Sequence, residues 1–187
     1  MKLKKGQLSD IILIVILLLF LFTPIGFHAR VQVMRLLSFS PSIEKKESYI
    51  KLSNYNWYLT DSNGKQSNFI EHTDKVIFLN YWATWCPPCI AEMPSLVELN
   101  KDYGDKVEFV FLANDDKDKV KSYLEKKDYH IPVYFKQTKT PEELKSSSLP
   151  TTFIINKKGD IVIKEVGVAD WNSKKVRDLL DNLLNED

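Results

Sequence analysis

The feature that most constrains this chain is the segment Trp85-Cys86-Pro87-Pro88-Cys89, which contains both cysteines of its 187 residues. An apolar run at residues 76–79 precedes it and predicts a buried strand, and a helical pattern follows it. At a helix start, unpaired backbone N–H groups and the helix dipole favour a thiolate on Cys86. Cys89 lies one helical turn further on, where a disulfide can close. The pair is therefore predicted to cycle between dithiol and disulfide.

Three other uses of the cysteines fit the sequence less well. A purely structural disulfide across so short a loop would add only roughly 2 kcal/mol of stability. A peroxidatic cysteine is disfavoured, since neither cysteine follows a Pro-x-x-x-Thr-x-x-Cys pattern. A zinc site needs two more ligands at short spacing. The histidines are scattered singly, so no metal site is predicted; they are His28, His72 and His130.

The N-terminal segment is strongly apolar. Residues 11–22 form an unbroken apolar run, and no formal charge occurs between Asp10 and Arg30. A helix over residues 11–27 would rise about 25 Å, close to the roughly 30 Å of bilayer hydrocarbon. We expect a transmembrane signal-anchor at residues 11–27, a short cytoplasmic N-terminus at 1–10 and a juxtamembrane linker at 28–47. A cleavable signal peptide is the alternative, although Phe27-His28-Ala29 is a poor cleavage site.

Either interpretation exports the rest of the chain to a compartment where disulfides persist. From Pro41 onward, 21 Lys and Arg residues stand against 24 Asp and Glu residues, a net charge of −3. The lysines are interleaved with acidic residues and form no dense basic block, so nucleic-acid binding has no support. The remaining length and hydrophobic content suit one compact domain, which we place at residues 48–187.

Strand and helix patterns alternate through this domain. Turn signals at residues 61–64 and 156–160 each predict a hairpin. Pro94 is expected to kink the helix that follows the cysteines. A C-terminal helix, capped at Asn172 or Ser173, has apolar residues at helical spacing. The other expected elements form a mixed α/β sandwich, with strands at 75–82, 107–113, 131–135, 151–155 and 161–166 and helices at 87–103 and 116–127.

Longer stretches of sequence carry a resemblance to a known family. They are residues 78–89 (FLNYWATWCPPC), Glu92-Met93-Pro94 and residues 149–156 (LPTTFIIN). Residues 48–187 resemble the thioredoxin fold, and within it the exported TlpA/ResA-like branch of membrane-anchored thiol-disulfide oxidoreductases. Residues 60–65 are similar to that branch's additional N-terminal β-hairpin. The resemblance implies a thioredoxin-like α/β fold, a mixed central sheet flanked by helices, with this hairpin and one transmembrane helix before it.

The resemblance also implies roles for individual residues. Cys86 would attack a client disulfide, and Cys89 would resolve the mixed disulfide. Pro150 would be a cis-proline that turns the Leu149 backbone outward to pair with an extended client segment. Glu92, one turn beyond Cys89, would accept the proton of the buried thiol. From spacing alone, a solvent-facing Glu92 is the simpler interpretation.

Further residues complete the implied site. Asn80 stands where cytoplasmic thioredoxins have a buried Asp, which moves the acid–base role to Glu92. The client-binding surface would also include Trp82, Trp85, Pro87 and Pro88.

These expectations describe a membrane-anchored reductase of exported disulfides on the periplasmic side of the inner membrane. No cofactor beyond its own cysteine pair is expected. The branch's best-known clients are c-type apocytochromes, with electrons relayed by a membrane protein, and general reduction of exported thiols fits equally well. Because Pro87 and Pro88 lack N–H donors, we expect a reduction potential on the order of −250 mV or below. The alternatives are a disulfide oxidant or isomerase, and a redox-silent binding module on the same fold.

Overall fold

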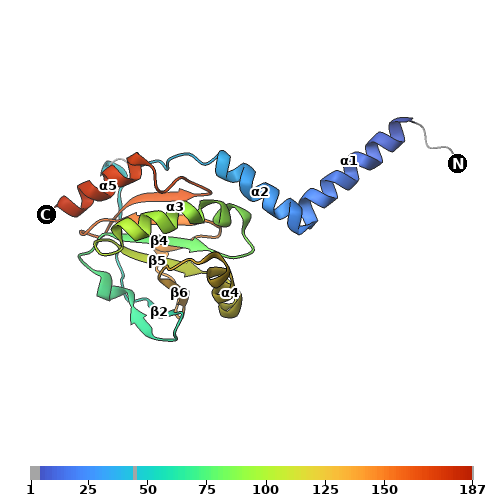
Figure 1. The fold of residues 1–187 in the computed structure, drawn as a ribbon. Coiled ribbons are helices and arrows are strands. Elements are labelled where there is room, and N and C mark those ends of the chain that lie inside the picture. Colours follow the sequence, from blue (N-terminus) through green and yellow to red (C-terminus); the bar gives the residue numbers. More distant parts are fainter. Residues whose placement is uncertain (1–4, 44–45, 187) are drawn as a thin grey trace.

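The computed structural model describes residues 5–43 and 46–186, in which two N-terminal helices precede an α/β domain (Figure 1). Helix α1 (Lys5–Phe22) and helix α2 (Pro24–Leu36) are separated at Thr23. The single helix expected over residues 11–27 is therefore wrong. Thr23 caps α2, because its hydroxyl accepts a hydrogen bond from the Gly26 N–H at 3.2 Å, and Pro24 opens the new helix.

The two N-terminal helices differ in their relation to the domain. Among the described residues, no helix alone has both the length and the hydropathy needed for a membrane span. Asp10–Phe22 and Pro24–Leu36 meet the criteria only when taken together, with a bend of 79° between them. Helix α2 packs on helix α3 (Pro87–Tyr103), where Val31 is buried against Ile90 and Ala91. The residues expected to form a linker therefore include a packed helix.

Eight strands form one mixed sheet in the order β1-β8-β7-β4-β5-β6-β2-β3. β4 is parallel to β5 and β5 to β6, whereas β7 runs antiparallel between β4 and β8. The expected mixed α/β architecture is confirmed. The strands are β1 (Ile50–Lys51), β2 (Tyr58–Asp61), β3 (Gln66–Asn68), β4 (Ile77–Trp82), β5 (Glu108–Ala113), β6 (Val133–Lys136), β7 (Thr151–Ile155) and β8 (Asp160–Val166).

The N-terminal hairpin predicted from its turn signal is also confirmed. β2 and β3 pair with each other, and β2 extends the sheet by pairing with β6, so that Leu59 lies opposite Lys136. Gly64 in the turn has a φ of +85°, a left-handed conformation that glycine adopts without strain. The hairpin therefore covers an edge that β6 would otherwise leave open.

The core has two parts, one on each face of the sheet. Helix α3, helix α4 (Lys117–Lys127) and helix α5 (Lys174–Asn185) share one part with sheet residues such as Phe78. The other part contains Leu79 and is covered by residues 52–57 and by two short 3-10 helices, η2 (Phe69–His72) and η3 (Glu142–Leu144). A third 3-10 turn, η1 (Lys46–Ser48), precedes β1. β4 is buried on both faces, which gives its C-terminal end a rigid position just before the cysteines.

Candidate active site

The cysteine pair lies at the N-terminus of α3. Cys86 is the N-cap of the helix, and its Sγ accepts a hydrogen bond from the Cys89 backbone N–H at 3.3 Å. Pro87 fills the first helical position. The two cysteines form a disulfide with their Cα atoms 5.3 Å apart, and both are buried. A thiolate on Cys86 would thus be stabilised by one N–H and by the dipole of α3.

Glu92 is buried one turn after Cys89, not exposed to solvent as its spacing alone suggested. Its Oε1 accepts a hydrogen bond from Asn80 Nδ2 at 2.9 Å. Its Oε2 accepts from the Trp171 indole N–H at 3.0 Å and from the Ala169 backbone N–H at 3.2 Å. Removal from water raises the pKa of Glu92 to about 8, although these hydrogen bonds favour the charged form.

Asn80 connects Glu92 to the strand that follows the cis-proline. Its Nδ2 donates to Glu92 and also to Thr152 Oγ1 at 2.8 Å. Its Oδ1 is buried and has no hydrogen-bond partner within the described part of the chain. The side chain of Asn80 therefore has one unused acceptor beside the buried carboxyl group.

Trp171 is a site residue that sequence reasoning missed. It comes from the loop between β8 and α5, about 80 residues after Glu92 in the chain, and is fully buried. Its ring packs edge-on against Phe78 with centroids 5.2 Å apart. The only sequence signal was a large aromatic residue inside the polar stretch Asp170-Trp171-Asn172.

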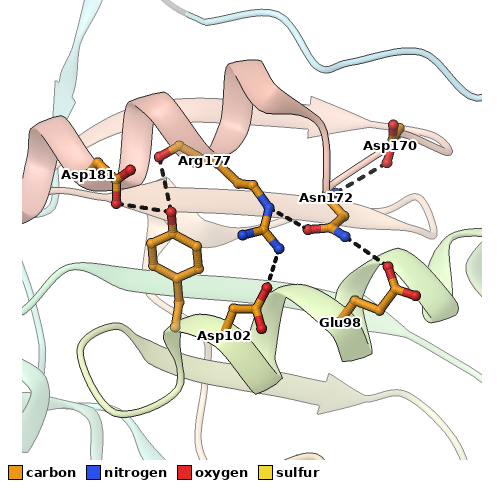
Figure 2. A network of polar contacts seen from close by, with 7 residues as sticks. Glu98, Asp102, Asp170, Asn172, Arg177 and Asp181 are labelled. Atoms are coloured by element: carbon orange, nitrogen blue, oxygen red, sulfur yellow. Dashed lines mark hydrogen bonds and ion pairs between the residues drawn. The ribbon is translucent and has the colours of Figure 1, made fainter.

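A polar network fixes the loop that carries Trp171 to α3 (Figure 2). Asn172 donates to Glu98 and accepts from Arg177 Nε, both at 2.8 Å. Arg177, on α5, also pairs with Asp102 on α3. Because Asn172 directly follows Trp171, these contacts hold the loop that supplies two of the three donors to Glu92, the Ala169 backbone N–H and the Trp171 indole N–H.

The peptide bond between Leu149 and Pro150 is cis, as the resemblance implies. Thr151, which follows Pro150, pairs with Tyr81 near the C-terminal end of β4. The cis-proline thus lies near the C-terminal end of β4, from which the chain continues into the cysteine motif. The Leu149 side chain is partly buried and packs against both parts of the core.

The two tryptophans near the cysteines have different surroundings. Trp85 is 59% exposed, whereas Trp82 is fully buried and packs against Tyr123 with ring centroids 5.8 Å apart. The expectation that Trp82 forms part of a client-binding surface is therefore wrong. The reason is that Trp82 is the last residue of β4, whose two faces are both covered. Pro87 and Pro88 are half-buried.

Within residues 5–43 and 46–186, no three His, Cys, Asp or Glu side chains are grouped so that they could hold a metal ion.

Comparison with known proteins gives consistent results. The model of the Redoxin family matches residues 38–183. The chain is 36% identical over 127 residues to a thiol-disulfide oxidoreductase ResA of Bacillus cereus, a match that covers 66% of this chain and 73% of ResA. It is 31% identical over 123 residues to the thioredoxin-like protein YneN of Bacillus subtilis (strain 168), covering 64% and 71% of the two chains. The solved structure of the exposed lipoprotein thioredoxin Etrx1 of Streptococcus pneumoniae is similar, with a TM-score of 0.55 and 25% identity over 68% of this chain and 96% of Etrx1.

Proposed function

This chain belongs to the Redoxin family and is a thiol-disulfide oxidoreductase, and we propose that Cys86 and Cys89 are its redox pair. The observation that carries the proposal is the position of the cysteines at the N-terminus of α3, one turn before the buried Glu92. We further propose that electrons flow from this pair to disulfides of extracytoplasmic proteins.

The reaction has two exchange steps. In the dithiol form, the Cys86 thiolate attacks one sulfur of a client disulfide, forms a mixed disulfide and releases the first client sulfur as a thiolate. Cys89 then loses its proton and attacks Cys86 Sγ, which releases the second client sulfur. The two electrons of the enzyme dithiol now reside on the client, whose thiolates take up protons. The enzyme is left with the Cys86–Cys89 disulfide, and a dithiol electron donor must reduce it again.

Glu92 would be the proton acceptor in the second step. Burial raises the pKa of Glu92 to about 8. A carboxyl group with its pKa raised toward neutral pH suits general acid–base catalysis. Glu92 also lines a cavity of about 330 Å³ together with Arg35, Ser95 and Asp170, and this cavity would let the proton exchange with solvent.

The environment of Cys86 supports the proposed direction of electron flow. A strong oxidant needs a very acidic nucleophilic thiol. Here Pro87 and Pro88 supply no N–H donors, and among the described residues only the Cys89 N–H donates to Cys86 Sγ. A moderately lowered thiol pKa and a reducing potential are therefore expected, which favours reduction over disulfide donation.

Client binding would use exposed groups around the disulfide. Trp85 offers an exposed aromatic ring beside Cys86. The backbone of Leu149, before the cis-proline, would pair with an extended client segment. Disulfide-bearing exported proteins, including c-type apocytochromes, would be the clients, and a membrane protein would supply electrons. The resemblance to the TlpA/ResA branch supports these partners.

We also propose that the N-terminus anchors the protein in the membrane, with the domain on the periplasmic side. The exposed apolar residues 11–22 of α1 would insert into the membrane, whereas α2 packs on α3 and would stay with the domain. Lysines at positions 2, 4 and 5 precede the apolar run at residues 11–22 and favour a cytoplasmic N-terminus. Resistance of the full chain to carbonate extraction from membranes would support the anchor, and a soluble exported form starting near residue 30 would contradict it.

The decisive experiment is substrate trapping with the full-length Cys89→Ser variant. A mixed disulfide on Cys86 should accumulate, because the resolving thiol is absent, and it should be visible on non-reducing gels with an oxidised c-type apocytochrome or a general exported disulfide protein as client. The matched control is Cys86→Ser, which keeps one cysteine but should trap no client. Equal trapping by both variants, or by neither, would contradict the assignment.

A redox titration of the wild-type chain tests the direction. The expected reduction potential is on the order of −250 mV or below, whereas a value of about −120 mV would favour disulfide donation.

A further inference from the structure

A second cavity, of about 300 Å³, lies beside the proposed client-binding loop. It is located where the parallel strands β4, β5 and β6 end, and Leu149 forms part of its wall. Three exposed lysines also line it, namely Lys136, Lys139 and Lys145. We call this cavity the basic groove. Because the chain from Pro41 onward has a net charge of −3, the positive charge gathered here is a local feature.

Of the three lysines that line the basic groove, only Lys145 forms an ion pair within the described part of the chain. Lys145 pairs with Glu142, and Glu143 accepts a hydrogen bond from the backbone of the segment before β2. A hydrogen bond from Lys145, with a weaker attraction from Lys139, lowers the pKa of Glu142. Within the described residues, no carboxylate lies within 4.0 Å of the ammonium group of Lys136 or Lys139. These two lysines are thus free to bind an outside anion.

The wall of the basic groove is ordered and continuous with the cis-proline. Tyr81 Oη donates to the Leu144 carbonyl at 2.9 Å, which holds the start of the loop against β4. Ser146 Oγ accepts from the Ser148 N–H at 3.2 Å and lies 2.7 Å from Thr151 Oγ1. The serines and Leu149 therefore form one structured segment. A client segment that pairs with the Leu149 backbone would therefore run beside the cavity that Leu149 and the lysines line together.

We propose that the basic groove binds an acidic side chain of the client, so that the enzyme prefers disulfides flanked by Asp or Glu. This inference rests on the proposed function, because it requires the client to lie along Leu149. Opposite charges across an interface steer association and fix the register of the bound segment. The groove would thus add sequence selectivity to a disulfide exchange that the cysteines alone would perform on many clients.

The test uses the full-length chain in detergent, fully reduced before mixing. Its probes are short peptides whose cysteine is disulfide-linked to a fluorescent thiol and flanked by Glu, Gln or Lys. The wild type should reduce the Glu peptide about fivefold or more faster than the Gln peptide, and the Lys peptide slowest, with the preference shrinking at high salt. The double variant Lys136→Gln/Lys139→Gln should bring the Glu-to-Gln rate ratio close to one.

A matched control is the double variant Lys126→Gln/Lys127→Gln. It makes the same charge change at the C-terminal end of α4. That end leads to the start of β6, whereas the basic groove is bordered by the opposite ends of the strands. This variant should keep the wild-type Glu-to-Gln rate ratio. Equal rates for the three peptides, or loss of the preference in the control, would overturn the groove proposal. If no peptide is reduced at all, the proposed function itself fails, so the two failures are distinguishable.

Discussion

Replacing Trp171 by Phe should raise the pKa of Glu92 further. The change removes the indole N–H that donates to Glu92 Oε2 at 3.0 Å, while a phenyl ring keeps the aromatic packing against Phe78. A hydrogen bond to a charged group is worth about 1.5–3 kcal/mol, and one pKa unit corresponds to about 1.36 kcal/mol. The indole N–H stabilises the charged carboxylate more than the protonated carboxyl group. Its loss should therefore raise the pKa of Glu92 by roughly 1–2 units. The pKa of Glu92, about 8 in the wild type, should therefore rise clearly above that value.

The assay is a carboxyl ¹³C NMR titration of the oxidised full chain, with the Glu92 signal identified by its absence in Glu92→Gln. Turnover gives a second readout, since a base must be deprotonated to act and the rate should rise with pH through the pKa of Glu92. In Trp171→Phe this rise should move to higher pH by the same amount.

The control for this experiment is Trp57→Phe. Trp57 is also fully buried, and its indole N–H has no hydrogen-bond partner in the described part of the chain. The same chemical change there should leave the pKa of Glu92 near 8. An unchanged or lowered pKa in Trp171→Phe, or an equal rise in both variants, would refute the hydrogen-bond account of this carboxyl group.

Two further predictions concern the pH dependence of stability. The pKa of Glu92 is raised from 4.5 to about 8, so the stability that its protonated form contributes is fully present below pH 4.5 and is lost as the pH rises through 8. Glu92→Gln should flatten this decline in the free energy of unfolding, measured with urea between about pH 5 and 9. The same pH dependence in both proteins would contradict the burial of the Glu92 charge. The His72 imidazole, whose Nδ1 lies 3.4 Å from Glu108 Oε2, and a hydrogen bond from Lys75 at 2.9 Å together outweigh burial and lower the pKa of Glu108 from 4.5 to about 2. The stability that the charged Glu108 contributes is therefore present above pH 4.5 and is lost as the pH falls through 2. Glu108→Gln should remove this loss of stability at low pH, measured by following unfolding as acid is added.

The redox motif and the succession of strands and helices along the chain could be predicted because both are local patterns. A strand, a cysteine at the helix cap and a proline in the first helical turn follow one another in sequence, so spacing alone places Cys86. The cis state of Pro150 came only from the family resemblance, since most bonds before proline are trans.

The burial of Glu92 could not be predicted from its neighbours in sequence. Its position three residues after Cys89 fixes only the face of α3 on which it lies. What covers that face is the loop with Ala169 and Trp171, which the polar network around Asn172 holds in place. The break at Thr23 was missed for a different reason: hydropathy is insensitive to a Thr-Pro cap inside an apolar run.

Asn80 explains how one site can hold Glu92 in either protonation state. The carboxylate needs donors, and Asn80 Nδ2 supplies one to Oε1 at 2.9 Å. A protonated Glu92 has a hydroxyl that needs an acceptor instead. The Oδ1 of Asn80 can supply it after the amide rotates by half a turn, which moves the amide N–H donors to the position where Oδ1 has no partner within the described residues. Thr152, whose hydroxyl both donates and accepts, can remain bonded to the amide in both orientations. An Asp at position 80 would place a second carboxyl group against the first, and the two charges would repel whenever both were ionised. The amide at this position therefore supports the proposal that the acid–base function resides on Glu92 alone.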